Sequence, residues 1–140
     1  MIKLFLRLLE VKCAVVGIIR KGDKILLTRR FKGIIEGGKW CLPGGGIKKW
    51  ERGDDAVKRE IFEETGFKVK KAKFLFYQDE LVRRLHFHGL VLVFLVDIFG
   101  KGRNNWEVSE ARWFDKKEIA GLDLAFSHKD ILRRFFENET

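Results

Sequence analysis

Apolar side chains fall into runs separated by short polar turns, and these runs predict alternating strands and helices. Residues 13–30 contain two β-branched and leucine-rich runs around a Lys-Gly-Asp turn at 21–23, the pattern of a β-hairpin. Residues 40–42 predict a short strand, and Pro-Gly-Gly-Gly at 43–46 predicts a turn. The first third of the chain is therefore expected to supply sheet strands.

The middle of the chain predicts one helix followed by strands. Residues 54–65 have helical composition, with an aspartate pair at 54–55 to cap the start and Gly66 to end the helix in a left-handed conformation. Residues 67–79 and 88–99 read as strands. The second is so uniformly apolar that we expect it to be central in the sheet, with both faces covered.

The last third predicts a short strand and a closing helix. A polar loop at 100–105 precedes the expected strand at 111–114, and residues 127–138 form a helix opened by the capping pattern Ser127-x-x-Asp130. Strands and helices thus alternate without strict βαβ periodicity. We expect an α/β protein with a mixed sheet and helices on both faces.

Length and composition favour one domain spanning residues 1–140, because 140 residues with 46% apolar side chains can bury a substantial core. Cys13 and Cys41 lack ligand spacing and indicate reduced thiols and a cytoplasmic location. Arg7, Glu10 and Lys12 interrupt the apolar N-terminus before it reaches the ~18 residues of a membrane span. We expect neither an anchor nor a signal peptide, and no membrane partner.

A formal net charge of +9 suits an anionic partner, yet Lys and Arg are scattered through the whole chain. A solvated surface, a phosphate-bearing small substrate and RNA are all compatible with that distribution. The charge therefore does not require a nucleic-acid partner, although an RNA 5′ end stays open as a substrate.

Three carboxylates on the predicted helix carry the candidate chemistry. At 100° per residue, Glu60, Glu63 and Glu64 point to one side, where like charges repel by about 0.2–0.5 kcal/mol per pair. A hard cation such as Mg²⁺ removes that penalty. The alternative is an ordinary solvated helix face, neutralised by Lys58 and Arg59.

Residues 45–67 resemble the signature of the Nudix hydrolases. That pattern is Gly, five residues, Glu, seven residues, Arg-Glu, an aliphatic residue, any residue, Glu-Glu, any residue, Gly and an apolar residue. Its fixed positions here are Gly45, Glu51, Arg59, Glu60, Ile61, Glu63, Glu64, Gly66 and Phe67. Residues 40–45 and 110–114 are similar to flanking parts of the family. The resemblance implies the Nudix α/β/α sandwich, with a mixed sheet and a catalytic loop and helix.

The resemblance also implies roles for these residues. Glu60 and Glu64 would be the principal Mg²⁺ ligands, with Mn²⁺ a possible substitute, and the carbonyl of Gly45 a further contact. Glu63 would be a third ligand or a base, and Arg59 would orient Glu51 or Glu63 through charge-assisted hydrogen bonds. The glycines expected to approach metal and phosphate closely are Gly44, Gly45 and Gly46.

The implied reaction is attack of water on one phosphorus of a P–O–P bridge, with Mg²⁺ neutralising the phosphate oxygens. Candidates for the general base are Glu63, Glu110 and Glu107, of which we favour Glu110 because it adjoins Trp113. Trp50 departs from the family, where many members have Gly, and either alters the loop or lines the pocket. Trp50, Trp106, Phe31 and Tyr77 are the aromatic residues considered for stacking on a base.

The favoured substrate is ADP-ribose, because residues 110–132 look like ADP-ribose pyrophosphatase-type members. Val82 stands where that subfamily often has Pro, which keeps the substrate choice open. A pyrophosphohydrolase that cleanses the (d)NTP pool, including oxidised purine nucleotides, is the near alternative. A non-catalytic nucleotide sensor is the alternative of another class, although such proteins typically lose the carboxylates present here. A homodimer is also left open.

Overall fold

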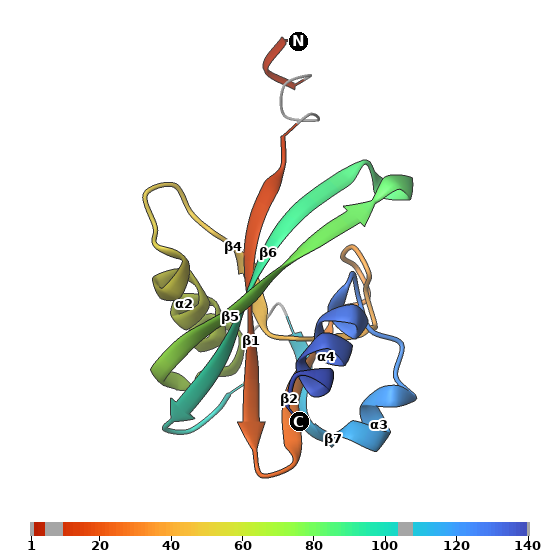
Figure 1. Cartoon of the computed structure of the whole chain (residues 1–140). Coiled ribbons are helices and arrows are strands. Elements are labelled where there is room, and N and C mark those ends of the chain that lie inside the picture. The colour runs from red at the N-terminus through yellow and green to blue at the C-terminus, as the bar shows by residue number, and fades with distance from the viewer. Residues whose placement is uncertain (1, 5–9, 104–107, 140) are drawn as a thin grey trace.

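The computed structural model of the chain describes residues 2–4, 10–103 and 108–139, and within these ranges it shows a mixed α/β fold (Figure 1). The strands are β1 (Lys12–Lys21), β2 (Lys24–Arg30), β3 (Trp40–Cys41), β4 (Gly44–Gly46), β5 (Lys68–Val82), β6 (Phe87–Phe99) and β7 (Val108–Asp115). The helices are α2 (Gly53–Thr65), the 3-10 turn η1 (Arg83–Leu85), α3 (Lys116–Ala120) and α4 (His128–Glu137). Among the described residues, no helix is long and apolar enough to cross a membrane.

The sheet is mixed, as the sequence predicts. Its strand order is β3-β2-β1-β6-β5, with β4 paired to β1 and β7 paired to β2. β1 and β6 are parallel, whereas the other pairs are antiparallel. β6 lies between β1 and β5, so the expectation that the most apolar strand is central is confirmed. The hairpin expected at 13–30 is also confirmed, and its strands β1 and β2 pair next to the turn.

Helices cover both faces of the sheet, because β1 alternates between two apolar clusters (Figure 1). Val15 and Ile19 pack with Ile61 of α2 on one face. Val16 and Ile18 pack on the other face, in the cluster to which α4 contributes Ile131, Leu132 and Phe135. Each cluster also contains side chains of β1, β2 and β6. The helix α2 therefore packs against the central strands on one face of the sheet, and α4 packs against them on the other.

The Pro-Gly-Gly-Gly segment differs from the expectation of a turn. Residues 44–46 form β4, which runs antiparallel to β1 with Gly44 opposite Val16 and Gly46 opposite Ala14. A Cβ at Gly44 would lie 2.0 Å from the carbonyl oxygen of Val15, so only glycine allows the strands to approach this closely. Three consecutive glycines have no side-chain alternation, which is why the pattern concealed this strand.

The helix ends match the predictions only in part. Gly66 ends α2 with φ 77°, as expected. The start is different: α2 begins after Arg52 without a side-chain cap, and Asp54 and Asp55 lie inside its first turn. Ser127 precedes α4, but it makes no side-chain cap and its hydroxyl donates to Glu80 instead. The helix α3 was not expected, although Asp115 and Glu118 form a capping box at its start.

Candidate active site

Two glutamates of α2 face the glycine strand β4. A Cβ at Gly45 would lie 2.5 Å from the carboxyl carbon of Glu60, so this carboxylate lies directly against β4. One turn further along α2, Glu64 is buried at 6% exposure, and its Oε1 is 3.4 Å from the backbone N–H of Gly44. The fold therefore brings Glu60 and Glu64 together with the backbone of Gly44–Gly46.

Arg59 is the centre of the hydrogen-bond network at this site. It donates twice to Glu51, over 2.8 and 2.9 Å, and this pairing holds the loop that precedes α2. It also donates to Glu60 at 2.8 Å and to Glu63 at 3.2 Å. A further bond reaches the carbonyl oxygen of Gly46 at 3.0 Å. The contacts of Arg59 with Glu51 and Glu63 that the sequence suggested are both present.

The electrostatics of the network follow from these contacts. The hydrogen bonds from Arg59 and from the backbone of Lys48 lower the pKa of Glu51 to about 2. The same carboxylates raise the pKa of Arg59 above its usual value, with Glu51 as the main cause. The guanidinium thus offsets much of the repulsion among the acids of α2, although the carboxylates outnumber it.

The donor set can be tested against the chemistry of a divalent cation. In the described part of the chain, no three His, Cys, Asp or Glu side chains converge as a complete metal cage. Mg²⁺ is usually held by one or two carboxylates, with waters and substrate phosphates completing its shell. Glu60 and Glu64 beside the backbone of Gly45 offer hard oxygen donors of that kind, so the residues present fit Mg²⁺.

Glu110, the favoured base, lies elsewhere. On β7 it accepts from Arg29 at 3.2 Å and from Arg112 at 2.8 Å, and these two partners lower its pKa. Trp113 packs with the α2 cluster, whereas Phe114 packs with the α4 cluster. By strand alternation Glu110 shares the face of Phe114, on the side of the sheet away from α2. The structure does not bring Glu110 to Glu60 and Glu64, and Glu107 and Trp106 lie outside the described residues.

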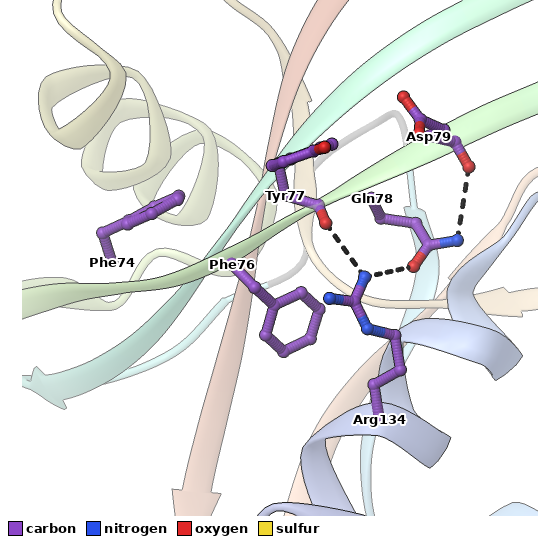
Figure 2. Close-up of a pocket in the computed structure, with 6 residues that line it drawn as sticks. All are labelled: Phe74, Phe76, Tyr77, Gln78, Asp79 and Arg134. Carbon is purple, nitrogen blue, oxygen red and sulfur yellow. Dashed lines mark hydrogen bonds between the residues drawn. The ribbon is translucent and has the colours of Figure 1, made fainter.

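Two hollows of the surface lie away from the carboxylates of α2. One of about 350 Å³ lies between β5 and α4, where Arg134 donates to the carbonyl of Tyr77 and to Gln78 and its guanidinium covers the Phe76 ring (Figure 2). Another of about 470 Å³ lies beside Glu110. It is lined by Arg29, Arg30, Phe31, Lys32, Gly38 and Glu110.

One supporting residue escaped the sequence reasoning. His128 at the start of α4 accepts a hydrogen bond on Nδ1 from the backbone N–H of Leu42, over 2.9 Å. This bond fixes the chain just before Pro43 and β4. Burial lowers the pKa of His128 to about 4, so the imidazole stays neutral and keeps its acceptor at neutral pH. No local pattern links residues so far apart in the sequence, and only the tertiary fold shows the pair.

Comparisons with known proteins identify the family of the chain. A model of the NUDIX domain matches residues 10–135. An ADP-ribose pyrophosphatase of Methanocaldococcus jannaschii is 35% identical over 127 residues, which cover 87% of this chain and 71% of that protein. A NAD-capped RNA hydrolase NudC of Chromobacterium violaceum is 28% identical, and the match covers 81% of this chain but 42% of that protein.

The solved structures agree with the sequence comparisons. The MutT NUDIX hydrolase of Burkholderia pseudomallei superposes with a TM-score of 0.78 at 28% identity, over 94% of this chain and 99% of that one. Fold, glycine strand and carboxylate helix together define a pyrophosphohydrolase of the Nudix class. The chain belongs to the NUDIX domain family and is a Nudix hydrolase.

Proposed function

We propose that the protein is a Mg²⁺-dependent pyrophosphohydrolase that cleaves the diphosphate of ADP-ribose, with residues 1–140 acting as one domain. The observation that carries this proposal is the placement of Glu60 and Glu64 against the glycine strand β4. The substrate rests on the 35% identity to an ADP-ribose pyrophosphatase over most of the chain. Mn²⁺ is a plausible substitute because it takes the same oxygen donors.

A bound Mg²⁺ would neutralise the phosphate oxygens and lower the pKa of water. In the proposed site Glu60, Glu64 and the carbonyl of Gly45 would hold it. The chain itself supplies orientation: Arg59 fixes Glu60 through a 2.8 Å bond and fixes the preceding loop through Glu51. The glycines of β4 have no side chains of their own, and a Cβ at Gly46 would meet nothing within 4 Å, so a phosphate can approach the backbone at that residue closely.

Glu63 is the better-placed candidate for the general base. Its side chain is 45% exposed, so a water molecule can reach it, and it lies on the same helix as the proposed ligands. The bond from Arg59 at 3.2 Å orients its carboxylate. Glu110, by contrast, is engaged by Arg29 and Arg112 on the other side of the sheet. We therefore assign the proton transfer to Glu63 in preference to Glu110.

Hydrolysis of an RNA 5′ end is the second candidate. Two observations favour it: the formal net charge of +9 and the 28% identity to a NAD-capped RNA hydrolase. The reaction would use the same carboxylates, because the cap also contains a P–O–P bridge. The two candidates therefore differ only in what is attached to the diphosphate.

A substrate panel with Mg²⁺ decides among these functions. We expect AMP and ribose 5-phosphate from ADP-ribose, with much lower turnover on 8-oxo-dGTP, on dGTP and on an RNA carrying a 5′ NAD cap. Glu64→Gln should lower turnover by about two orders of magnitude or more, since it removes a metal ligand while keeping the shape of the side chain. Faster cleavage of a triphosphate or of the capped RNA would reassign the substrate. Inactivity on the whole panel would favour a nucleotide sensor.

A further inference from the structure

Trp50 has an unusual backbone and an unusual exposure. Its φ is 69°, in the left-handed region that favours glycine. Its side chain is 92% exposed, more than any other large apolar residue that the structure describes. A bulky residue therefore occupies a strained backbone conformation without burying its ring.

Packing does not compensate for this strain. A side chain exposed to this degree buries almost no apolar surface, so it gains little from the hydrophobic effect. The ammonium group of Lys49 lies 5.4 Å from the centre of the ring, a contact between two surface groups. A strained residue that contributes little to stability of the free protein points to a role in binding.

The position of Trp50 places it next to the proposed catalytic residues. The neighbouring residue Glu51 is held by two hydrogen bonds from Arg59, and Arg59 also bonds Glu60. The N–H of Glu51 donates to the carbonyl of Lys48, which closes a turn around the tryptophan. The ring therefore projects from a loop that is tied directly to the carboxylates.

Two lysines, Lys48 and Lys49, directly precede Trp50 in the sequence. By contrast, Arg52 is paired with Asp54 at 3.3 Å, and Glu51 is neutralised by Arg59. An exposed aromatic face among positive charges suits a ligand that combines a flat ring with phosphates. A nucleotide has this chemistry, whereas an apolar protein surface would leave the cations without partners.

We propose that Trp50 is a specificity-determining residue that stacks on the nucleobase of the substrate while its diphosphate lies at Glu60 and Glu64. This inference rests on the proposed function, because it assumes that the diphosphate occupies the glycine strand. It adds a base-recognition element to the loop 47–52. The phosphates gain charge complementarity from the flanking lysines, and the base gains a stacking partner.

The test compares two substrates, one with and one without the adenosine. Steady-state KM and kcat are measured for ADP-ribose and for ribose 5-diphosphate, which has the P–O–P bond but lacks both the base and the ribose that carries the base. Trp50→Gly and Trp50→Ala should each raise KM for ADP-ribose about 5- to 100-fold, the range expected for loss of one base–aromatic stack. Both variants should leave kcat and the baseless substrate unchanged within about twofold, and Trp50→Phe should retain most of the affinity.

Melting temperatures separate strain from binding. Trp50→Gly should melt a few degrees above Trp50→Ala, because glycine adopts the left-handed conformation without cost, while both lose the same stack. Phe99→Ala removes another exposed aromatic side chain, at the end of β6, and should leave KM at the parent value.

The results that would overturn the inference differ from the result that would overturn the proposed function. An unchanged KM for ADP-ribose in Trp50→Gly would overturn the inference alone, and so would an equal rise for both substrates. If the parent cleaves neither substrate, the proposed function fails. AMP is then titrated into parent and Trp50→Gly: weaker binding in the variant supports the stack, and equal affinity or no binding overturns it.

Discussion

Arg59 is the residue on which the geometry of the carboxylates depends. Its planar guanidinium bonds Glu51, Glu60, Glu63 and the carbonyl of Gly46 at the same time. A guanidinium has five donors in a fixed fork, whereas an ammonium is a compact charge without that geometry. The position therefore selects for Arg through shape as well as through charge.

Replacing Arg59 by lysine tests this role. Arg59→Lys keeps the charge but loses the bidentate pair of hydrogen bonds to Glu51. We therefore expect kcat/KM to fall by about 10- to 100-fold and the Mg²⁺ concentration needed for the half-maximal rate to rise. The matched control is Arg52→Lys, because the side chain of Arg52 is exposed and bonds Asp54. It should keep the parent's rate. Parent-like activity in Arg59→Lys would show that charge alone suffices.

The identity of the base is a second question at the residue scale. Removing a general base costs about 10²- to 10⁴-fold in turnover. We expect Glu63→Gln to show a loss in that range and Glu110→Gln to lose less than about tenfold, because Glu110 is engaged by Arg29 and Arg112. Rates measured at saturating Mg²⁺ across pH 5–9 would distinguish a base from a ligand. A larger loss in Glu110→Gln would restore Glu110 as the base.

At the scale of elements, the start of α4 connects the sheet to the site. Glu80 of β5 is 5% exposed and accepts from both the backbone N–H and the hydroxyl of Ser127. The next residue, His128, accepts from Leu42 just before β4. The contact of Ser127 with Glu80 therefore fixes α4 on β5, and the buried contact of His128 with Leu42 fixes the chain before the glycine strand on α4.

This arrangement predicts a pH dependence of stability. Burial lowers the pKa of His128 to about 4, from 6.5 in an exposed imidazole. Between these two pH values the unfolded chain therefore binds a proton at this residue and the native state does not. The free energy of unfolding should therefore fall as pH falls from 6.5 to about 4, by up to about 3 kcal/mol from this group. Urea unfolding at several pH values measures the slope. Other carboxylates titrate in the same range, so the slope must be compared between variants.

His128→Gln should have a shallower slope in this window than the parent, whatever its absolute stability, because glutamine does not titrate. His86→Gln is the control, since His86 is exposed, and it should keep the parent's slope. Equal slopes in parent and His128→Gln would mean that His128 takes up its proton in the native state as easily as in the unfolded chain.

Elements with a strong pattern were predictable from sequence, and those without one were not. The β-branched run of β1, the apolar run of β6 and the stop of α2 at Gly66 all identified their elements. β4 has no side chains to show a period, and its formation depends on contact with β1. The Nudix-like spacing indicated the carboxylate cluster, but the engagement of Glu110 with Arg29 depends on the pairing of β7 with β2, which local sequence does not determine.

At the scale of the whole molecule, the net charge of the protein is positive, whereas the carboxylates on α2 form a cluster of the opposite sign. The formal net charge of +9 attracts anionic substrates over the surface. On α2, Glu60, Glu63 and Glu64 still outnumber Arg59, so the site remains locally negative. A divalent cation and an anionic substrate together satisfy both parts of this charge distribution.

Metal binding should therefore stabilise the native state. If Mg²⁺ binds Glu60 and Glu64 and does not bind the unfolded chain, the gain is RT ln(1 + [Mg²⁺]/Kd), or about 2.7 kcal/mol at one hundred times Kd. For a domain of this size the melting temperature should rise by a few degrees, and differential scanning calorimetry with and without Mg²⁺ measures the shift. Glu64→Gln should lose most of this rise while it relieves part of the repulsion, so its metal-free form should melt no lower than the parent's. If the melting temperature of the parent does not change with Mg²⁺, either the carboxylates are an ordinary helix face or the cation enters only together with the diphosphate. Repeating the scan with AMP and Mg²⁺ separates these two outcomes.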